Sequence, residues 1–154
     1  MPSRGVDTPI GKLGLVASKR GLSNVRWSAS GLPDDPSSVL DEAAAQLEAY
    51  FAGELTSFEL PLDLRGTEFQ RRCWLALATI PYGQTVSYGE QARRLALGPD
   101  AARAVGAANG QNPLPVILPC HRVIGADRSL TGFGGGLHLK RFLLEHEGAL
   151  LSLG

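Results

Sequence analysis

Cysteine is scarce in this sequence: the 154 residues include only two, Cys73 and Cys120. Two thiols cannot build the disulfide framework of a small secreted domain, and a disulfide between them is disfavoured inside a cell. They also lack the ligand spacing of a structural zinc site, so we expect no metal. Each cysteine is therefore expected to be a single thiol that is either buried or reactive.

Long apolar runs are missing as well. No stretch approaches the roughly 18 apolar residues that a membrane-spanning helix needs. The N-terminus runs into mixed polar sequence and lacks the apolar core of a signal peptide. With 44% hydrophobic and 19% charged residues, the composition is that of an ordinary globular protein. We expect a cytoplasmic protein that makes no membrane contact.

The chain has no net charge, because 15 basic side chains balance 15 acidic ones, but their distribution is uneven. Residues 1–64 carry five basic and nine acidic side chains, whereas residues 65–141 carry ten basic and four acidic. A basic middle segment suits a nucleic-acid surface, because phosphate contacts dominate affinity. On charge alone, a solvated surface of mixed charge explains the same counts.

Residues 1–65 predict a small α/β lobe. Apolar and polar residues alternate over 11–18 and 22–28, which indicates two strands joined by a tight turn. Residues 39–51 then repeat apolar positions at helical spacing, and residues 56–64 alternate again and predict a short strand. The expected fold class is therefore α/β (α+β), with this sheet-plus-helix lobe first.

Residues 66–154 predict a mostly helical domain. Two capping boxes, at residues 67–70 and 87–90, open helices that are expected to end near positions 78 and 96. A Gly-Pro pair then breaks the chain and starts a third helix over 99–109. Two short helices around a glycine-containing turn match a helix-turn-helix, although many such hairpins bind nothing.

The last part of this domain contains three further elements. Residues 116–118 are apolar and lie between two prolines, which makes them a candidate for a buried strand. Residues 132–136 form a glycine-rich loop, and residues 137–147 predict a final helix. The side chains that this helix is expected to bury are Leu139, Phe142 and Leu143.

The helix expected at 99–109 carries mostly small side chains, and Arg103 is the one long residue that projects from it. Such a helix is poor at reading base edges, which takes long polar side chains. Small residues instead permit close approach to a nucleic-acid backbone or a narrow groove. From there Arg103 could reach into the base stack.

Cys120 is followed directly by His121 and Arg122, which places a thiol beside an imidazole and a guanidinium. A thiol attacks as the thiolate, which a nearby base or positive charge favours. His121 is the candidate base, directly or through a water, and Glu147 is the candidate carboxylate that orients it. The alternative is an inert, buried Cys120 with His121 in the core. Cys73, within a helical apolar pattern, is expected to be such a core residue.

Cys120 lies in one of six short motifs that follow each other along the second domain. The motif around it is Asn112-Pro113 followed by Pro119-Cys120-His121-Arg122-Val123-Ile124-Gly125. The others are Gly66-Thr67-Glu68-Phe69-Gln70, Ile80-Pro81-Tyr82-Gly83, Ser87-Tyr88-Gly89, Arg103-Ala104-Val105-Gly106 and Leu143-Leu144-Glu145-His146-Glu147-Gly148. In this order they resemble the O6-alkylguanine-DNA alkyltransferase (methylated-DNA–protein-cysteine methyltransferase) family. The resemblance is close over about residues 66–148 and looser before them.

The resemblance implies a role for each active-site residue. Cys120 is the alkyl acceptor, His121 is the base that acts through a water, and Glu147 polarises this relay. Asn112 holds the active-site turn together, while Tyr88 assists base rotation and hydrogen-bonds the leaving guanine. No cofactor is implied, because the reaction consumes the protein itself.

The resemblance also implies the substrate and how it is bound. The partner is double-stranded DNA containing O6-alkylguanine, with O4-alkylthymine as a further lesion. The 97–109 region is the recognition helix, laid in the minor groove with Ala101 and Ala102 against the DNA. Arg103 fills the gap left by the flipped base. One acceptor and one DNA surface in a single chain favour a monomer.

Four residues are expected to form the substrate pocket. Pro115 and Phe133 provide its walls, while backbone groups at Val123 and Gly134 read the base edge. The family commonly carries tyrosine at the position of Phe133, so one hydroxyl is missing and the tolerance of groups larger than methyl stays open. Arg122 completes the motif, with a structural rather than a chemical job.

Two other functions compete with alkyl transfer. An alkyltransferase-like sensor would share the fold and bind alkylated bases, but such proteins lack the acceptor cysteine that this chain has. A thiol hydrolase would use the Cys-His-Glu relay to cleave an ester or an amide with turnover. Nothing else in the chain supports the oxyanion site that a hydrolase would need.

Overall fold

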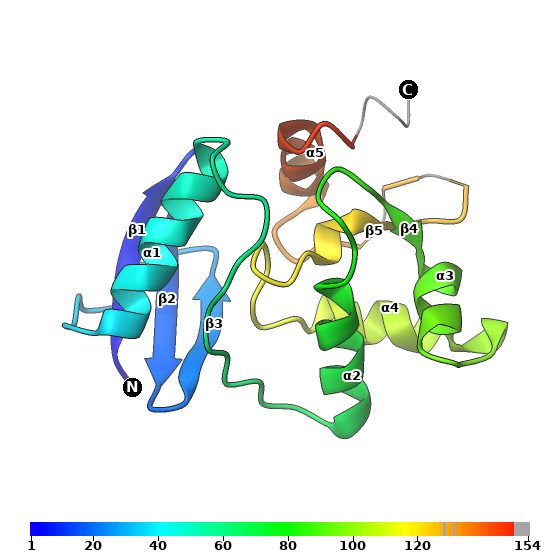
Figure 1. The fold of residues 1–154 in the computed structure, drawn as a ribbon, viewed down its shortest axis with the longest axis horizontal. Coiled ribbons are helices and arrows are strands. Elements are labelled where there is room, and N and C mark those ends of the chain that lie inside the picture. Colours follow the sequence, from blue (N-terminus) through cyan, green and yellow to red (C-terminus); the bar gives the residue numbers. More distant parts are fainter. Residues whose placement is uncertain (128, 131, 150–154) are drawn as a thin grey trace. The chain divides into compact units, whose positions relative to one another are not determined.

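The structure, a computed structural model, describes residues 1–127, 129–130 and 132–149 (Figure 1). The chain divides into two compact units, Met1–Arg65 and Gly66–Gly154. Strands and helices are both present, which confirms the mixed α/β class. Residues 150–154 of the expected second domain lie outside the described part. Within that part, every helix is too short or too polar to cross a membrane.

The first unit is a three-stranded antiparallel sheet with one helix. Strands β1 (Ser3–Thr8), β2 (Gly11–Ser18) and β3 (Gly21–Arg26) are neighbours in chain order. Helix α1 (Ser38–Phe51) lies along one face of this sheet (Figure 1). The largest wholly buried side chains of this unit are Leu13, Leu15, Leu22, Leu40, Leu47 and Tyr50. The two strands and the helix predicted for 11–18, 22–28 and 39–51 are therefore confirmed to within a residue or two at their ends.

The strand predicted over residues 56–64 is wrong. Only Leu62 pairs there, in a single parallel bridge to Leu22. Pro61 immediately precedes it and has no N–H to donate, which prevents a continuous ladder. β1 was not expected, because its sequence is largely polar. Ser3 is nevertheless buried, since its N–H and its hydroxyl both donate to the loop at residues 33–35.

The second unit contains the predicted helix-turn-helix. Helix α2 (Glu68–Leu77) opens on the predicted capping box between Thr67 and Gln70, and helix α3 (Tyr88–Arg94) is capped by Ser87. A short 3-10 turn, η1 (Pro99–Ala101), leads into helix α4 (Ala102–Gly110). The helix predicted over 99–109 therefore begins as a 3-10 turn and is otherwise confirmed.

A short parallel sheet connects these helices to Cys120. Strand β4 (Val86–Ser87), directly before α3, pairs with β5 (Val123–Ile124). Cys120 begins the 3-10 turn η2 (Cys120–Arg122), which runs straight into β5. The sheet therefore fixes the start of α3 next to the residues that follow the candidate nucleophile.

The strand predicted over residues 116–118 is wrong. These residues form a buried turn, in which the Leu118 N–H donates to the Leu114 carbonyl and Val116 adopts a φ of 73°. This left-handed backbone conformation is strained for a β-branched residue, and it persists only where the surrounding structure supports it. Proline on both sides, without an N–H to donate, disfavours a strand here.

Helix α5 (Leu137–His146) buries a face that differs in part from the predicted one. Leu143 is buried as predicted, but Phe142 is 37% exposed and Leu139 is only partly buried. The buried stripe, which continues past the helix end, consists of Lys140, Leu143, Leu144 and Glu147. The prediction failed because it excluded charged residues from the inward face, and both ends of this stripe are charged.

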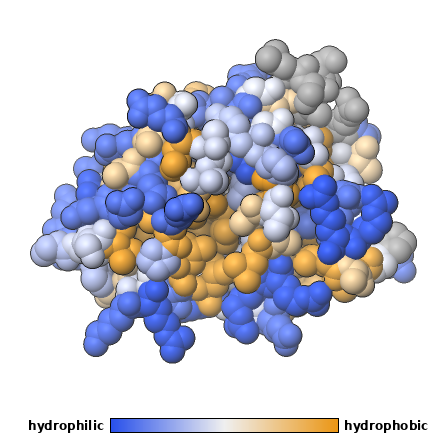
Figure 2. Space-filling view, in the orientation of Figure 1, coloured by the Kyte–Doolittle hydropathy of each residue, from blue (hydrophilic) through white to orange (hydrophobic). Residues whose placement is uncertain are grey.

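Exposed apolar side chains give no clue to a partner. Figure 2 shows hydrophilic side chains over much of the visible face, with hydrophobic surface between them. The large apolar side chains that are exposed among the described residues are Met1, Leu75, Leu137 and Phe142. Scattered residues of this kind are normal on globular proteins.

Candidate active site

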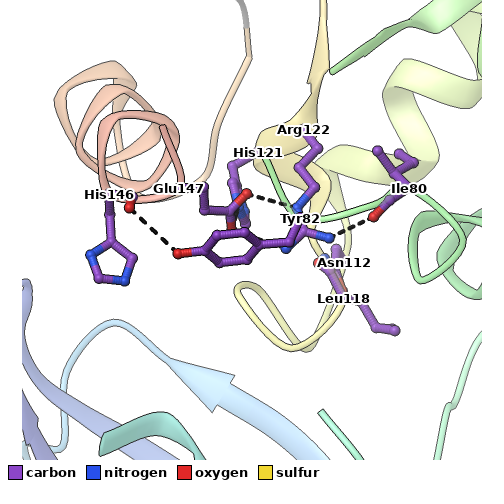
Figure 3. Close-up of polar contacts among 8 residues, drawn as sticks. All are labelled: Ile80, Tyr82, Asn112, Leu118, His121, Arg122, His146 and Glu147. Atoms are coloured by element: carbon purple, nitrogen blue, oxygen red, sulfur yellow. Dashed lines mark hydrogen bonds and ion pairs between the residues drawn. The ribbon is translucent and has the colours of Figure 1, made fainter. Parts of the chain in front are cut away.

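The end of α5 and the turn η2 bring together the imidazole and the carboxylate that the sequence singled out. Nε2 of His121 lies 2.8 Å from Oε2 of Glu147, and both side chains are buried (Figure 3). The two residues are 26 positions apart in the chain. His121 therefore has a fixed orientation directly beside Cys120 in sequence.

Arg122 holds the same carboxylate from the other side. Its Nε donates to Oε1 of Glu147 at 2.8 Å and its Nη2 to Oε2 at 3.0 Å, a bidentate pair (Figure 3). Its Nη1 donates to the carbonyl of Ile80 at 2.6 Å, and its guanidinium lies 5.7 Å from the centre of the Tyr82 ring. The sequence indicated a structural job for Arg122 but offered no sign of these partners.

These contacts determine the protonation of the pair. Burial alone would raise the pKa of Glu147, but hydrogen bonds from His121 and Arg122 outweigh it and hold that pKa well below its usual range. Burial lowers the pKa of His121, although the hydrogen bond to Glu147 opposes this shift. At neutral pH the carboxylate is therefore ionised and the imidazole is neutral.

The hydrogen-bonded pair also assigns the tautomer of His121. An ionised carboxylate can only accept, so the imidazole proton must be on Nε2, where it donates to Glu147. Nδ1 then carries the lone pair. It is buried, and within the part of the chain that the structure describes it has no hydrogen-bond partner. His121 thus presents a free basic nitrogen, which is what a general base needs.

Cys120 is a free thiol at the start of η2 and is partly buried. Burial raises the pKa of its thiol, while a hydrogen bond with Asn112 and the charge of Lys140 oppose the rise. The resting thiol is therefore protonated at neutral pH, and attack requires that its proton be removed. Cys73, by contrast, lies on α2 and is wholly buried in the core that this helix forms with α3 and α4, as predicted.

Asn112 supports the turn that carries Cys120. Its Nδ2 donates to the Leu118 carbonyl at 2.8 Å, and its Oδ1 accepts from the Leu114 N–H at 2.9 Å. The Leu118 carbonyl also accepts from the Cys120 N–H at 2.8 Å. The Asn112 side chain therefore hydrogen-bonds to both ends of the buried turn and helps to position Cys120.

Tyr88 and Arg103 lie on one surface pocket of about 460 Å³. The pocket is lined by Tyr88, Gly89, Ala102, Arg103, Gly106 and Ala126. Helices α4 and α3 are close at Gly106, where a β-carbon would lie at an ordinary contact distance of 3.6 Å from the Tyr88 ring. Arg103 is exposed, whereas Ala101 packs against the core behind α4 and has less surface to offer DNA.

The four expected pocket residues have different environments. Pro115 is buried within the turn, and Phe133 and Gly134 lie on the loop next to Gly132, where a β-carbon would be 3.9 Å from the Tyr88 hydroxyl. Val123 is wholly buried, its N–H donates to the Cys120 carbonyl and its carbonyl accepts from Lys140. The N–H of Val123 is therefore already engaged inside the protein and is not available to read a base.

Two family descriptions match this chain. Residues 68–149 match the DNA-binding domain of 6-O-methylguanine DNA methyltransferase, and residues 4–64 match its ribonuclease-like domain. The chain belongs to the 6-O-methylguanine DNA methyltransferase family. The resemblance that the six motifs carry is thereby confirmed, and it extends to the N-terminal lobe.

Relatives in this family match almost the whole chain. The methylated-DNA–protein-cysteine methyltransferase of Mycobacterium bovis is 54% identical over 94% of this chain and 90% of its own length, and that of Methanosarcina acetivorans is 47% identical over 93% and 96%. The crystal structure of Mycobacterium tuberculosis OGT in complex with DNA superposes with a TM-score of 0.87, at 52% identity, over 97% of this chain and 94% of that one.

Two buried side-chain amides link helices α3 and α4, and the sequence analysis did not identify them. Nε2 of Gln91 donates to Oδ1 of Asn109 at 3.2 Å, and Nδ2 of Asn109 donates back to Oε1 of Gln91 at 2.8 Å. Gln91 also donates to the Cys73 carbonyl. The pair links α3 to α4, and no motif or spacing in the sequence indicated it.

Acid should unfold the protein by protonating the relay. The pKa values of His121 and Glu147 both lie below their ordinary values of 6.5 and 4.5, so the unfolded chain binds more protons than the folded one as the pH falls. We expect the free energy of unfolding to decrease below about pH 6.5 and more steeply below about pH 4.5. Urea unfolding across this range measures it.

A His121→Gln variant isolates the first part of that loss. Histidine is the side chain that ordinarily titrates near pH 6, and His121 is the one of the three histidines that is wholly buried, so this variant should be flat where the parent protein declines. A decline of equal size in the variant would contradict the assignment to His121.

Proposed function

We propose that this chain repairs DNA by direct reversal, transferring the alkyl group of O6-alkylguanine irreversibly to its own Cys120. The observation that carries this is the buried relay beside the thiol: an ionised Glu147, a neutral His121 and a free lone pair on Nδ1. Such a relay can take the proton from a thiol that burial keeps protonated.

The transfer balances without any added reactant. The Cys120 proton passes to Nδ1 of His121, directly or through a water, and the resulting imidazolium is stabilised by Glu147. The thiolate attacks the alkyl carbon, a sulfur–carbon bond forms, and the carbon–O6 bond breaks with its electron pair left on the guanine. The guanine takes up one proton, for which the Tyr88 hydroxyl is the donor, and the proton held by His121 then replaces it on Tyr88 through solvent. The products are S-alkylcysteine and guanine, so each protein molecule reacts once.

The substrate must be extruded from the duplex before it can react. A base inside the stack hides its O6 substituent, so the protein has to flip the nucleotide. Arg103 is exposed on α4 next to the Tyr88 pocket, where it is suited to fill the space that the base leaves. The small residues Ala102 and Gly106 beside it permit close approach to a minor groove. We include O4-alkylthymine as a second substrate, because it carries the same alkoxy carbon.

The chain acts alone in this proposal, as a cytoplasmic monomer without a cofactor. Both the acceptor thiol and the exposed arginine lie in one unit of one chain. Cys73 and Cys120 are free thiols, which suits a reducing compartment. Cys120 remains available as a nucleophile only while it is reduced.

Counting repaired lesions tests the proposal against its rivals. The protein is titrated against excess duplex DNA that carries one O6-methylguanine per molecule, and restored guanine is counted per protein. We expect a plateau at one lesion per protein chain, because the acceptor is consumed. A thiol hydrolase would pass this limit and continue, and a non-catalytic sensor would bind the lesion but restore none. Either result would contradict alkyl transfer to Cys120.

A further inference from the structure

Gln91 and Asn109 are buried polar side chains that no step of the proposed transfer uses. Gln91 is 2% exposed and Asn109 is 7% exposed. Their amides hydrogen-bond to each other in both directions, at 3.2 and 2.8 Å, and Gln91 also donates to the Cys73 carbonyl at 3.2 Å. Three helices therefore meet at this amide pair, because Cys73 lies on α2, Gln91 on α3 and Asn109 on α4 (Figure 1).

The amide pair lies one helical turn away from the Tyr88 pocket. Gln91 follows Tyr88 by three residues on α3, and Asn109 follows Gly106 by three residues on α4. Residues three apart lie on the same face of a helix. The close approach of Gly106 to the Tyr88 ring is thus followed, one turn further along both helices, by the amide pair. Two successive contacts of this kind fix both the spacing and the rotation of α3 against α4.

The apolar part of this helix junction is made of mostly small side chains. Its buried core consists of Cys73, Ala92, Val105 and Ala108. Apolar contacts have no preferred direction, so a small slide or rotation of one helix on the other costs them little. Hydrogen bonds are directional, and a displacement that breaks them leaves buried amides unpaired, which is costly. The amide pair therefore selects one arrangement of α3 and α4 from those that the apolar core tolerates.

Stability alone does not explain two buried amides at this junction. Replacing both partners of a buried hydrogen bond by apolar groups of similar shape can be nearly neutral for stability. A buried polar contact can instead fix the register of helices that would otherwise pack in several ways. The arrangement of α3 and α4 determines the shape of the pocket, because both helices line it. Tyr88 and Gly89 line it from α3, and Ala102, Arg103 and Gly106 line it from α4.

We infer that Gln91 and Asn109 are positioning residues that hold Tyr88 and Arg103 at the spacing needed to extrude the alkylated base. This inference rests on the proposed function. A misplacement of about 1 Å in groups that act on a substrate can slow its reaction by about 100-fold. The hydrogen bond between His121 and Glu147 does not involve the amide pair. The amide pair should therefore affect reaction with a base in duplex DNA and leave the intrinsic reactivity of the thiol unchanged.

An apolar pair separates this role from stability. In the double variant Gln91→Leu with Asn109→Leu, side chains of similar volume replace both amides, so urea unfolding should stay close to that of the parent protein. Transfer from duplex O6-methylguanine is followed at increasing DNA concentration. We expect the maximal rate to fall by about 10- to 100-fold. Iodoacetamide should alkylate the peptide that contains Cys120 at the parent rate, a split that a merely structural role would not produce.

Exchanging the two amides provides the conservative variant. Gln91→Asn with Asn109→Gln keeps the combined length of the pair and both amide groups, so it should recover most of the lost rate. Gln111→Leu removes an exposed amide at the end of α4 and should leave the rate unchanged. A folded apolar double variant that transfers at the parent rate would overturn the inference, as would an exchanged pair that recovers none of the loss.

A second measurement needs no variant and keeps the inference testable if the apolar pair does not fold. Exchange of side-chain amide protons with solvent is followed by nitrogen-15 NMR in the free protein and in its complex with undamaged duplex DNA. We expect the amides of Gln91 and Asn109 to exchange more slowly than that of the exposed Gln111 in both states. Exchange as fast as that of Gln111 in either state would show that the pair opens and does not hold the helices.

Failure of this inference is distinguishable from failure of the proposed function. If the parent protein restores guanine in the O6-methylguanine duplex and the apolar pair does so equally fast, only the role of the two amides is wrong. If the parent protein restores no guanine, the proposed function fails, whatever the exchange rates of the two amides.

Discussion

Replacing Glu147 by glutamine should slow methyl transfer by about 10²- to 10⁴-fold, the range that a general-base relay contributes. The amide oxygen of glutamine can still accept a hydrogen bond from the Nε2–H of His121, so the imidazole can keep its orientation. The negative charge that stabilises the imidazolium is lost, however, and the thiol proton then has a poorer acceptor. Rapid-quench measurement of transfer from duplex O6-methylguanine gives the rate.

Glu145→Gln is the matched control for this variant. Glu145 lies in the last turn of α5, two residues before Glu147, but it is exposed and pairs with Arg141 on the surface. Its rate should equal that of the parent protein. Binding of lesion-containing duplex should be unchanged in both variants, because the Glu147 side chain is buried. A Glu147→Gln protein that transfers at the parent rate would show that the buried relay is not the base.

Replacing Arg122 by methionine should destabilise the fold by about 3–5 kcal/mol, the cost of leaving one partner of a buried ion pair uncompensated. The guanidinium makes two hydrogen bonds to Glu147 and one to the Ile80 carbonyl. Methionine fills much of the space but donates to neither, so a buried carboxylate loses most of its support. Urea unfolding at neutral pH gives the loss.

Arg141→Met controls for the removal of one positive charge. Arg141 pairs with Glu145 at the surface, where an ion pair contributes little. Its unfolding midpoint should stay close to that of the parent protein. Equal stability of Arg122→Met and the parent would contradict the view that Arg122 holds Glu147 in place. Arg122 would then be a motif residue that the stability of the fold does not require.

Local signals in the sequence predicted the elements that depend on local interactions. The capping box from Thr67 to Gln70 involves neighbours in the chain, so the start of α2 could be read directly. The same holds for α1, whose apolar positions repeat at helical spacing. The alternation of apolar and polar residues at 56–64 wrongly predicted a strand. Strand pairing there depends on hydrogen bonds to β3, which is distant in sequence, and Pro61 has no N–H to donate to such a ladder.

The candidate site divides in the same way. His121 stands next to Cys120 in the chain and could be named from sequence, whereas its contact with Glu147 depends on how α5 packs. The partners of Arg122 and the burial of Lys140 depend on packing too. One signal was available: Lys140, Leu143, Leu144 and Glu147 have the spacing of a single helix face. Charged residues at the two ends of an apolar helix stripe are compatible with a buried polar site as well as with a solvent-exposed helix face.

The most direct test of the account is where the methyl group goes. The protein is incubated with duplex DNA that carries one isotope-labelled O6-methylguanine, and its intact mass and digested peptides are measured, with Cys120→Ser in parallel. We expect a gain of one labelled methyl group per chain, found on the peptide with Cys120 and absent from the variant. Label on Cys73, label in the Cys120→Ser protein, or restored guanine with no mass gain would contradict the account.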